Sequence, residues 1–197
     1  MKLLYLLAAF IGAGLAQQGG PLVTNLPPNR GGSGTSVDIK FLPGANGSVG
    51  STPLNLAISG SPQPYYSVGG TNGNVIGILI FTNGISQSAW GNFPIPSVVP
   101  SSLTVEIKWY TADNTSGHNV IWNFNTACSS TSVDPALSNA NTVTTIVPAT
   151  ASQMTTSTIT LTPSCSPGDQ AFFSLIGRGD TETANAVVNL VSLRIHS

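Results

Sequence analysis

Alternating apolar and polar positions are the clearest signal along this chain. From 103 to 110 apolar residues occupy every odd position, and the same period of two runs from Val120 to Asn125. Such alternation is typical of β-strands that pack one face on a core and expose the other. The turn-forming run 113–117 separates the two segments, so the sequence predicts a β-hairpin here.

Further strand patterns follow, separated by turn signals. The nearly all-apolar run Val75–Phe81 predicts a central strand, and residues 157–162, 170–176 and 186–195 predict three more. Three Asn-Gly pairs favour tight turns, and the one short helical signal follows Asp134-Pro135. We therefore predict an all-β fold over residues 37–197: a single antiparallel β-sandwich, jelly-roll-like, of about eight strands.

The N-terminus has the layout of a secretory signal peptide. Lys2 precedes the apolar run Leu3–Ala16, and small residues stand before Gln17. This run is too short to span a bilayer, so residues 1–16 are expected to be cleaved. Residues 17–36 are rich in Gly, Pro and Asn and predict a flexible leader. The mature protein is expected to be secreted, extracellular or periplasmic; a buried N-terminal helix is the alternative.

Charge is scarce, at 7% of residues against about 25% in typical soluble proteins. The net charge of −1 provides no basic surface for phosphates, which argues against nucleic-acid binding. No further apolar stretch is long enough to span a membrane. Polarity comes instead from Ser, Thr, Asn and Gln, which suits a neutral glycan or self-assembly with other copies of the chain.

The two cysteines, Cys128 and Cys165, are expected to pair. Export exposes thiols to an oxidising compartment, where disulfides form and persist. A bridge between these positions would stabilise the fold by about 3–4 kcal/mol in the chain-entropy model. Two separate buried cysteines are the alternative.

Catalytic patterns are weak, and we assign no catalytic residue. A glycosidase needs two opposed carboxyl groups, and no acidic pair in the chain has a spacing that requires this role. A serine nucleophile needs a base, but His118 follows a turn glycine, His196 is penultimate, and no Gly-x-Ser-x-Gly elbow occurs.

Oxygen ligands on loops make calcium the one cofactor to consider. Asp113, Asp180 and Glu182 lie in or near turns and suit a hard cation, although no EF-hand pattern is present. Local turn chemistry explains these residues equally well. Arg178-Gly179-Asp180 spells a tripeptide that some animal adhesion receptors recognise, but a turn with a surface ion pair is the simpler interpretation.

Aromatic residues offer the main route to ligand binding. Trp109 and Trp122 share the apolar faces of their strands and are expected in the core. Trp90, Tyr65 and Tyr66 stand in polar, Pro- and Gly-rich surroundings, so they are the candidates for a glycan-binding platform. Half-buried anchoring of loops is the alternative role for these three rings.

The chain from about Gly77 onward also resembles a loosely defined group of β-sandwich (jelly-roll-like) domains. The matching segments are Phe93–Pro96, Leu103–Trp109, Ser116–Trp122, Ser164–Phe173 and Arg178–Thr181. Such domains occur in predicted phage virion or tail proteins and in secreted bacterial proteins of unassigned function. The resemblance implies a structural or binding module and carries over no catalytic residue. The signal-peptide pattern favours the secreted branch.

Together these observations predict a secreted, non-catalytic module, first of all a subunit of an extracellular or cell-surface assembly. A soluble carbohydrate-binding module is the alternative, and a phage virion or tail protein is a second one. An enzyme, in particular a glycosidase, is the least favoured hypothesis.

Overall fold

The computed structural model describes residues 37–42, 51–53, 55–56, 63–69 and 74–197. The predicted signal peptide (1–16) and leader (17–36) lie outside these residues and stay predictions. The described segments contain twelve β-strands and no helix. The strands are β1 (Asp38–Leu42), β2 (Ser51–Pro53), β3 (Asn55–Leu56), β4 (Gln63–Gly69), β5 (Asn74–Phe81), β6 (Ser86–Pro94), β7 (Leu103–Thr111), β8 (Asn119–Ser129), β9 (Ser138–Ile146), β10 (Thr155–Leu161), β11 (Gln170–Arg178) and β12 (Val188–His196).

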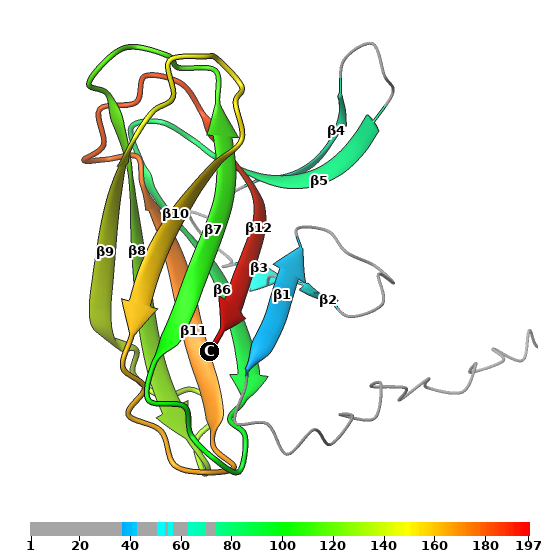
Figure 1. Ribbon diagram of the computed structural model, residues 1–197, viewed down its shortest axis with the longest axis vertical. Helices are drawn as coiled ribbons and strands as arrows, with labels where there is room; N and C mark the ends of the chain where they lie inside the picture. The colour runs from blue at the N-terminus through cyan, green and yellow to red at the C-terminus, as the bar shows by residue number, and fades with distance from the viewer. Residues whose placement is uncertain (1–36, 43–50, 54, 57–62, 70–73) are drawn as a thin grey trace, which may run out of the picture. The chain divides into compact units, whose positions relative to one another are not determined.

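The strands form two sheets, whose longer strands face one another in Figure 1. The first sheet has the order β10-β7-β12-β1-β2, with β5 pairing β12 and β4 pairing β5; the second has the order β3-β6-β11-β8-β9. The eight long strands thus run β5-β12-β7-β10 in one sheet and β6-β11-β8-β9 in the other. This is the strand order of a jelly roll, and the predicted fold class is confirmed.

Four further strands, β1 to β4, extend the two sheets beyond these eight. One edge of β12 is shared: β5 pairs with Val188–Leu190, and β1 pairs with the following part, Leu193–His196. The register of β12 against β7 shifts between Leu190 and Ser192, which indicates a β-bulge. The bulge lies where the partner on the other edge of β12 changes from β5 to β1. The β1–β2 pair is parallel, so the sandwich is antiparallel apart from this one described pair.

The core lies between the inward faces of the two sheets. Trp109, Trp122 and Phe124 are each 0% exposed, as their alternation predicts for the two tryptophans. The rings pack in specific geometries: Phe81 meets Trp122 edge-on with centroids 5.0 Å apart, and Phe124 stacks on Phe173 at 5.0 Å. Aromatic pairs of this kind contribute beyond the area that they bury.

Two of the eight long strands, β6 and β9, correspond to no strand pattern identified in the sequence. The inward positions of β6 are occupied by Gln87, Ala89, Gly91 and Phe93, so small and polar residues hide the alternation. A Cβ at Gly91 would collide with the Phe173 ring, which accounts for the missing side chain there. The strand β9 forms the edge of its sheet, and its inward positions Asn141, Val143 and Thr145 are only partly buried, so they give no apolar period. The short helical turn expected after Asp134 is absent, and the chain there forms bends that lead into β9.

Cys128 and Cys165 form the predicted disulfide, with Cα atoms 5.3 Å apart. Cys128 lies on β8 in the second sheet, whereas Cys165 lies in the segment that leads from β10 to β11. The bridge therefore ties the crossover between the two sheets to a strand of the second one. In the part of the chain described here, no helix has the length and apolar character needed to span a membrane.

Candidate functional site

A hollow of about 180 Å³ opens on the outer face of the second sheet. Its walls come from two neighbouring strands, β6 and β11, and from the loop between β8 and β9. The lining residues are Trp90, Gly91, Asn92, Phe172, Val133, Asp134, Pro135 and Leu137. We call this hollow the Trp90 groove.

Strand pairing fixes two rings and an amide at the base of the groove. Trp90 pairs with Ser174, and Asn92 pairs with Phe172. Alternation along β6 turns Gly91 towards the core and exposes Trp90 and Asn92. The residue Trp90 is 40% exposed, which is high for so large an apolar side chain. The sheet thereby holds an accessible indole on rigid backbone.

The loop that closes the groove is built from serine turns. The hydroxyl of Ser129 accepts hydrogen bonds from the amides of Thr131 (3.2 Å) and Ser132 (2.7 Å). The hydroxyl of Ser132 accepts from the amide of Asp134 (3.2 Å). These bonds stabilise a tight path that leaves Val133 90% exposed beside the groove.

The polar groups of the groove are nearly all uncharged. Asn92 accepts a hydrogen bond from Gln170 Nε2 at 2.9 Å, which orients its side chain and leaves its own amide N–H groups for a ligand. On the same face of the sheet, the amide of Asn125 donates a hydrogen bond to the hydroxyl of Ser174 at 3.4 Å, although neither residue lines the groove. Asp134 is the only charged residue among those that line the groove.

The predicted platform of Trp90, Tyr65 and Tyr66 is divided between the two sheets. Trp90 is on β6 of the second sheet, whereas Tyr65 and Tyr66 are on β4, which pairs with β5 in the first sheet. The side chains of the two tyrosines lie outside the described part of the structure. Sequence reasoning missed Phe172 and Val133, which the groove adds to Trp90. Neither residue carries a local signal, because the pairing of β6 with β11 and the loop path bring them there.

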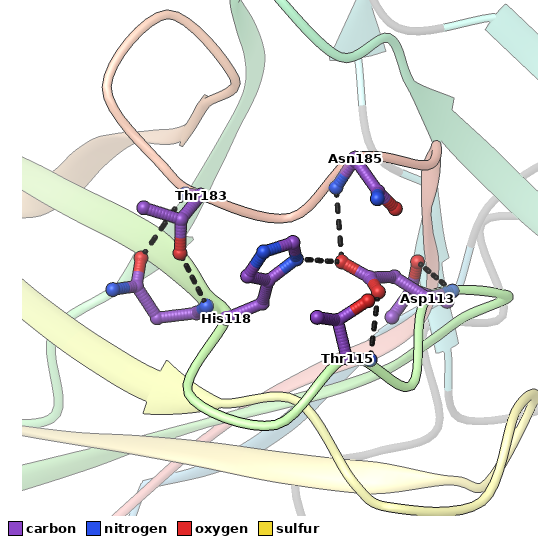
Figure 2. A network of polar contacts seen from close by, with 7 residues as sticks. Asp113, Thr115, His118, Thr183 and Asn185 are labelled. Carbon is purple, nitrogen blue, oxygen red and sulfur yellow. Dashed lines mark hydrogen bonds and ion pairs between the residues drawn. The ribbon is translucent and has the colours of Figure 1, made fainter.

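A second polar network surrounds Asp113, at the end of the sandwich where β7 leads into β8 (Figure 2). The carboxylate accepts hydrogen bonds from the amides of Thr115 and Asn185, both at 2.9 Å, and its Oδ2 lies 2.7 Å from Nδ1 of His118. Burial alone would raise the pKa of Asp113, but these hydrogen bonds outweigh it and hold the pKa well below its usual range. Asp113 thus fastens the β7–β8 turn to the loop before β12.

The other two predicted calcium ligands lie in that same loop. Asp180 forms a two-bond ion pair with Arg178, at 2.9 and 3.1 Å, as expected for a turn, and the pair lowers the pKa of its carboxyl. Glu182 accepts a hydrogen bond from the amide of Ile121 at 3.3 Å, and burial together with Asp180 raises its pKa to about 7. Within the described segments, no group of three or more His, Cys, Asp or Glu could hold a metal ion. Calcium binding by Asp113, Asp180 and Glu182 stays a prediction.

No protein-family model matches this chain. A search of curated proteins found no match either.

Among solved structures, matches include several carbohydrate-binding modules. A family 6 module from Cellvibrio mixtus lichenase 5A, in complex with cellotriose, has a TM-score of 0.41 and 18% identity, covering 71% of this chain and 88% of its own. The CBM22-1 xylan-binding domain from Paenibacillus barcinonensis Xyn10C has a TM-score of 0.42 and 10% identity, covering 81% and 91%. TmCBM61, in complex with β-1,4-galactotriose, has a TM-score of 0.37 and 8% identity, covering 72% and 85%. Similarity at this level assigns neither a family nor a ligand, so any function has to rest on the site itself.

Proposed function

We propose that this protein is a non-catalytic carbohydrate-binding module of the extracellular space and that the Trp90 groove takes a neutral glycan. The observation that carries the proposal is the exposed indole of Trp90, held on a strand and surrounded by uncharged hydrogen-bonding groups. This replaces the assembly subunit as the preferred function, because the groove offers a specific ligand chemistry.

The groove has the two kinds of surface that a sugar ring needs. One face of a pyranose is lined by C–H groups, which pack on the face of an aromatic ring, and Trp90 and Phe172 provide such rings. The rim of a pyranose carries hydroxyls, which the amide of Asn92 can bind. Binding sites for small ligands combine apolar walls with a few polar groups in this way.

The absence of a second carboxyl in the groove supports binding without hydrolysis. Both retaining and inverting glycosidases use a pair of carboxyl groups on either side of the scissile bond. Asp134 is the one carboxylate among the residues that line the groove. A glycan bound against Trp90 would therefore meet no acid–base pair.

Titration with neutral polysaccharides and their oligosaccharides, followed by calorimetry and by tryptophan fluorescence, tests the proposal. Trp109 and Trp122 are both 0% exposed, so a change in emission on binding reports on Trp90. We expect Trp90→Ala to weaken glycan binding by about tenfold or more, which corresponds to about 1.4 kcal/mol.

Met154→Ala is the matched control, since Met154 is a large apolar residue that is 49% exposed and does not line the groove. This variant should bind like the wild type. Equal binding by Trp90→Ala and the wild type would rule out the groove as the site. If no neutral glycan binds to the folded protein, the proposed function itself fails.

The extracellular assembly stays a prediction, as does the resemblance to virion and secreted β-sandwich domains. Light scattering over a wide range of protein concentrations would distinguish a monomeric module from an assembling subunit.

A further inference from the structure

Charged side chains gather on the outer face of the first sheet, although the chain has only six basic and seven acidic residues. Glu106 and Lys108 lie two positions apart on β7, and Arg194 lies on the neighbouring strand β12. Asp38 joins them from β1 through its ion pair with Arg194. Four of the charged residues of the chain therefore share one accessible face of the sheet.

The same residues surround a hollow of about 200 Å³, lined by Glu106, Lys108, Ser192 and Arg194. The strand register explains the hollow: Ser192 pairs with Lys108, and Arg194 pairs with Glu106. Directly paired residues lie within about 4.5–5.5 Å of each other. One short side chain therefore stands among three long ones, and the missing length of Ser192 leaves the space.

The hydrogen-bonding capacity of this hollow is largely unused. Arg194 directs Nε and Nη2 to Asp38, at 2.8 and 2.9 Å, and this bond pair fixes its guanidinium. Its Nη1 lies 3.7 Å from a Glu106 oxygen, and Nε2 of His196 lies 3.6 Å from the other one, both too far for a good hydrogen bond. The carboxylate of Glu106 therefore lies near Arg194 and His196 but keeps capacity to accept further hydrogen bonds.

Lys108 and Ser192 have no partners of their own in the part of the structure described. Lys108 is exposed and forms no ion pair there, so its ammonium group is available. Ser192 is only 4% exposed, and its hydroxyl forms no hydrogen bond to any described group, although it lines the hollow. The Oγ atom itself is not fully buried, so a ligand or solvent in the hollow can reach this hydroxyl.

These groups together define the chemistry of an occupant. The ammonium of Lys108 attracts one anionic group, and the carboxylate of Glu106 accepts hydrogen bonds from hydroxyls. The hydroxyl of Ser192 can both donate and accept a hydrogen bond. Thr156 and Thr158 on β10 pair with Lys108 and Glu106 and add exposed hydroxyls beside the hollow. Phosphate carries its charge on one compact group without hydroxyl-rich flanks, whereas a uronic sugar can direct its carboxylate to Lys108 and its hydroxyl donors to Glu106.

We propose that the hollow around Ser192 is a second binding site, which takes an acidic saccharide unit of the uronic-acid class. The carboxylate of the sugar binds Lys108, and its hydroxyls donate to Glu106 and exchange hydrogen bonds with Ser192. This site lies on the opposite sheet from the Trp90 groove and does not depend on it. The proposal goes beyond the neutral-glycan function and is tested independently of it.

Calorimetric titration with trigalacturonic acid and with its methyl ester tests the proposal, because esterification removes the charge of each carboxylate and otherwise adds only a methyl group. We expect the acid to bind about tenfold or more tightly than the ester at low salt, and the difference to shrink as salt is added. Lys108→Met keeps the apolar stem of the side chain, removes the ammonium and should weaken binding of the acid by about tenfold.

Arg178→Met is the matched control, since it also removes one positive charge but lies away from the hollow. It should leave binding of the acid unchanged, as should Trp90→Ala. Ser192→Val fills the hollow without changing charge, and should reduce binding in a protein whose melting temperature and circular dichroism show that it is folded. Equal affinity for acid and ester, equal effects of Lys108→Met and Arg178→Met, or no binding of galacturonate and mannuronate oligomers would each overturn the proposal.

Discussion

Among single residues, Ser157 shows how a buried polar group is accommodated in this core. Its hydroxyl accepts a hydrogen bond from the indole N–H of Trp109 at 2.8 Å and lies 2.7 Å from the hydroxyl of Thr145. Trp109 and Ser157 belong to the first sheet and Thr145 to the second, so one serine joins the two sheets. The burial of Trp109 follows from alternation in the sequence, but its partner does not, since Ser157 lies 48 positions away.

We expect Ser157→Ala to lower the free energy of unfolding by about 1–3 kcal/mol, because the buried indole N–H loses its acceptor. Urea unfolding followed by circular dichroism measures this loss. Thr158→Ala, at the neighbouring exposed position of β10, is the control and should change stability by no more than about 0.5 kcal/mol. A Ser157→Ala variant as stable as this control would show that the hydrogen bond contributes nothing.

Between secondary-structure elements, the loop from β11 to β12 is held by several polar contacts. Asn185 donates its amide to Asp113, Thr183 exchanges hydrogen bonds with Asn119, and Glu182 accepts one from Ile121. The loop thus continues the pairing of β11 along the end of β8. Sequence reasoning predicted turn residues here but could not predict which backbone amides they would bind, since those belong to distant strands.

Glu182 makes the stability of this loop depend on pH. Burial raises its pKa from the usual 4.5 to about 7 in the folded protein, so the folded state favours the protonated form. The stabilising contribution is fully present below about pH 4.5 and is lost as the pH rises through about 7. We therefore expect Glu182→Gln to be more stable than the wild type at pH 8, with the difference reduced to a small remainder near pH 5.

Thermal unfolding between pH 5 and pH 8 measures this difference. Asp113 does not interfere in this window: its lowered pKa means that its contribution is lost only in more acidic solution, as the pH falls below about 4. Asp134→Asn, which removes an exposed carboxyl, is the control and should parallel the wild type. Parallel curves for Glu182→Gln and the wild type would contradict the buried position of this carboxyl.

At the scale of the whole domain, two sheets are joined by crossovers, and the disulfide secures one of them. Cys128 and Cys165 lie 37 positions apart and pack against the core. In the chain-entropy model, such a bridge stabilises the folded state by restricting the unfolded chain. The bridge raises the free energy of unfolding of the whole domain, because it lowers the entropy of the unfolded chain.

We expect Cys128→Ala/Cys165→Ala to lower the free energy of unfolding by about 3–4 kcal/mol. Denaturant unfolding with and without reductant measures it, and the double variant serves as its own control, since reductant should destabilise only the wild type. Identical unfolding of the wild type under both conditions would show that the bridge adds no stability.

The sequence by itself determined the β-class, the burial of Trp109 and Trp122, and the pairing of the two cysteines, because each follows from local alternation or from residue chemistry. Only the tertiary structure decided that β6 is a strand, since its inward Gln87 and Gly91 give no apolar period, and the glycine is explained by the Phe173 ring that packs on it. It likewise placed Trp90 beside Phe172, and Lys108 beside Ser192. Those neighbours arise from pairing between strands far apart in the chain, which local patterns of hydrophobicity do not encode.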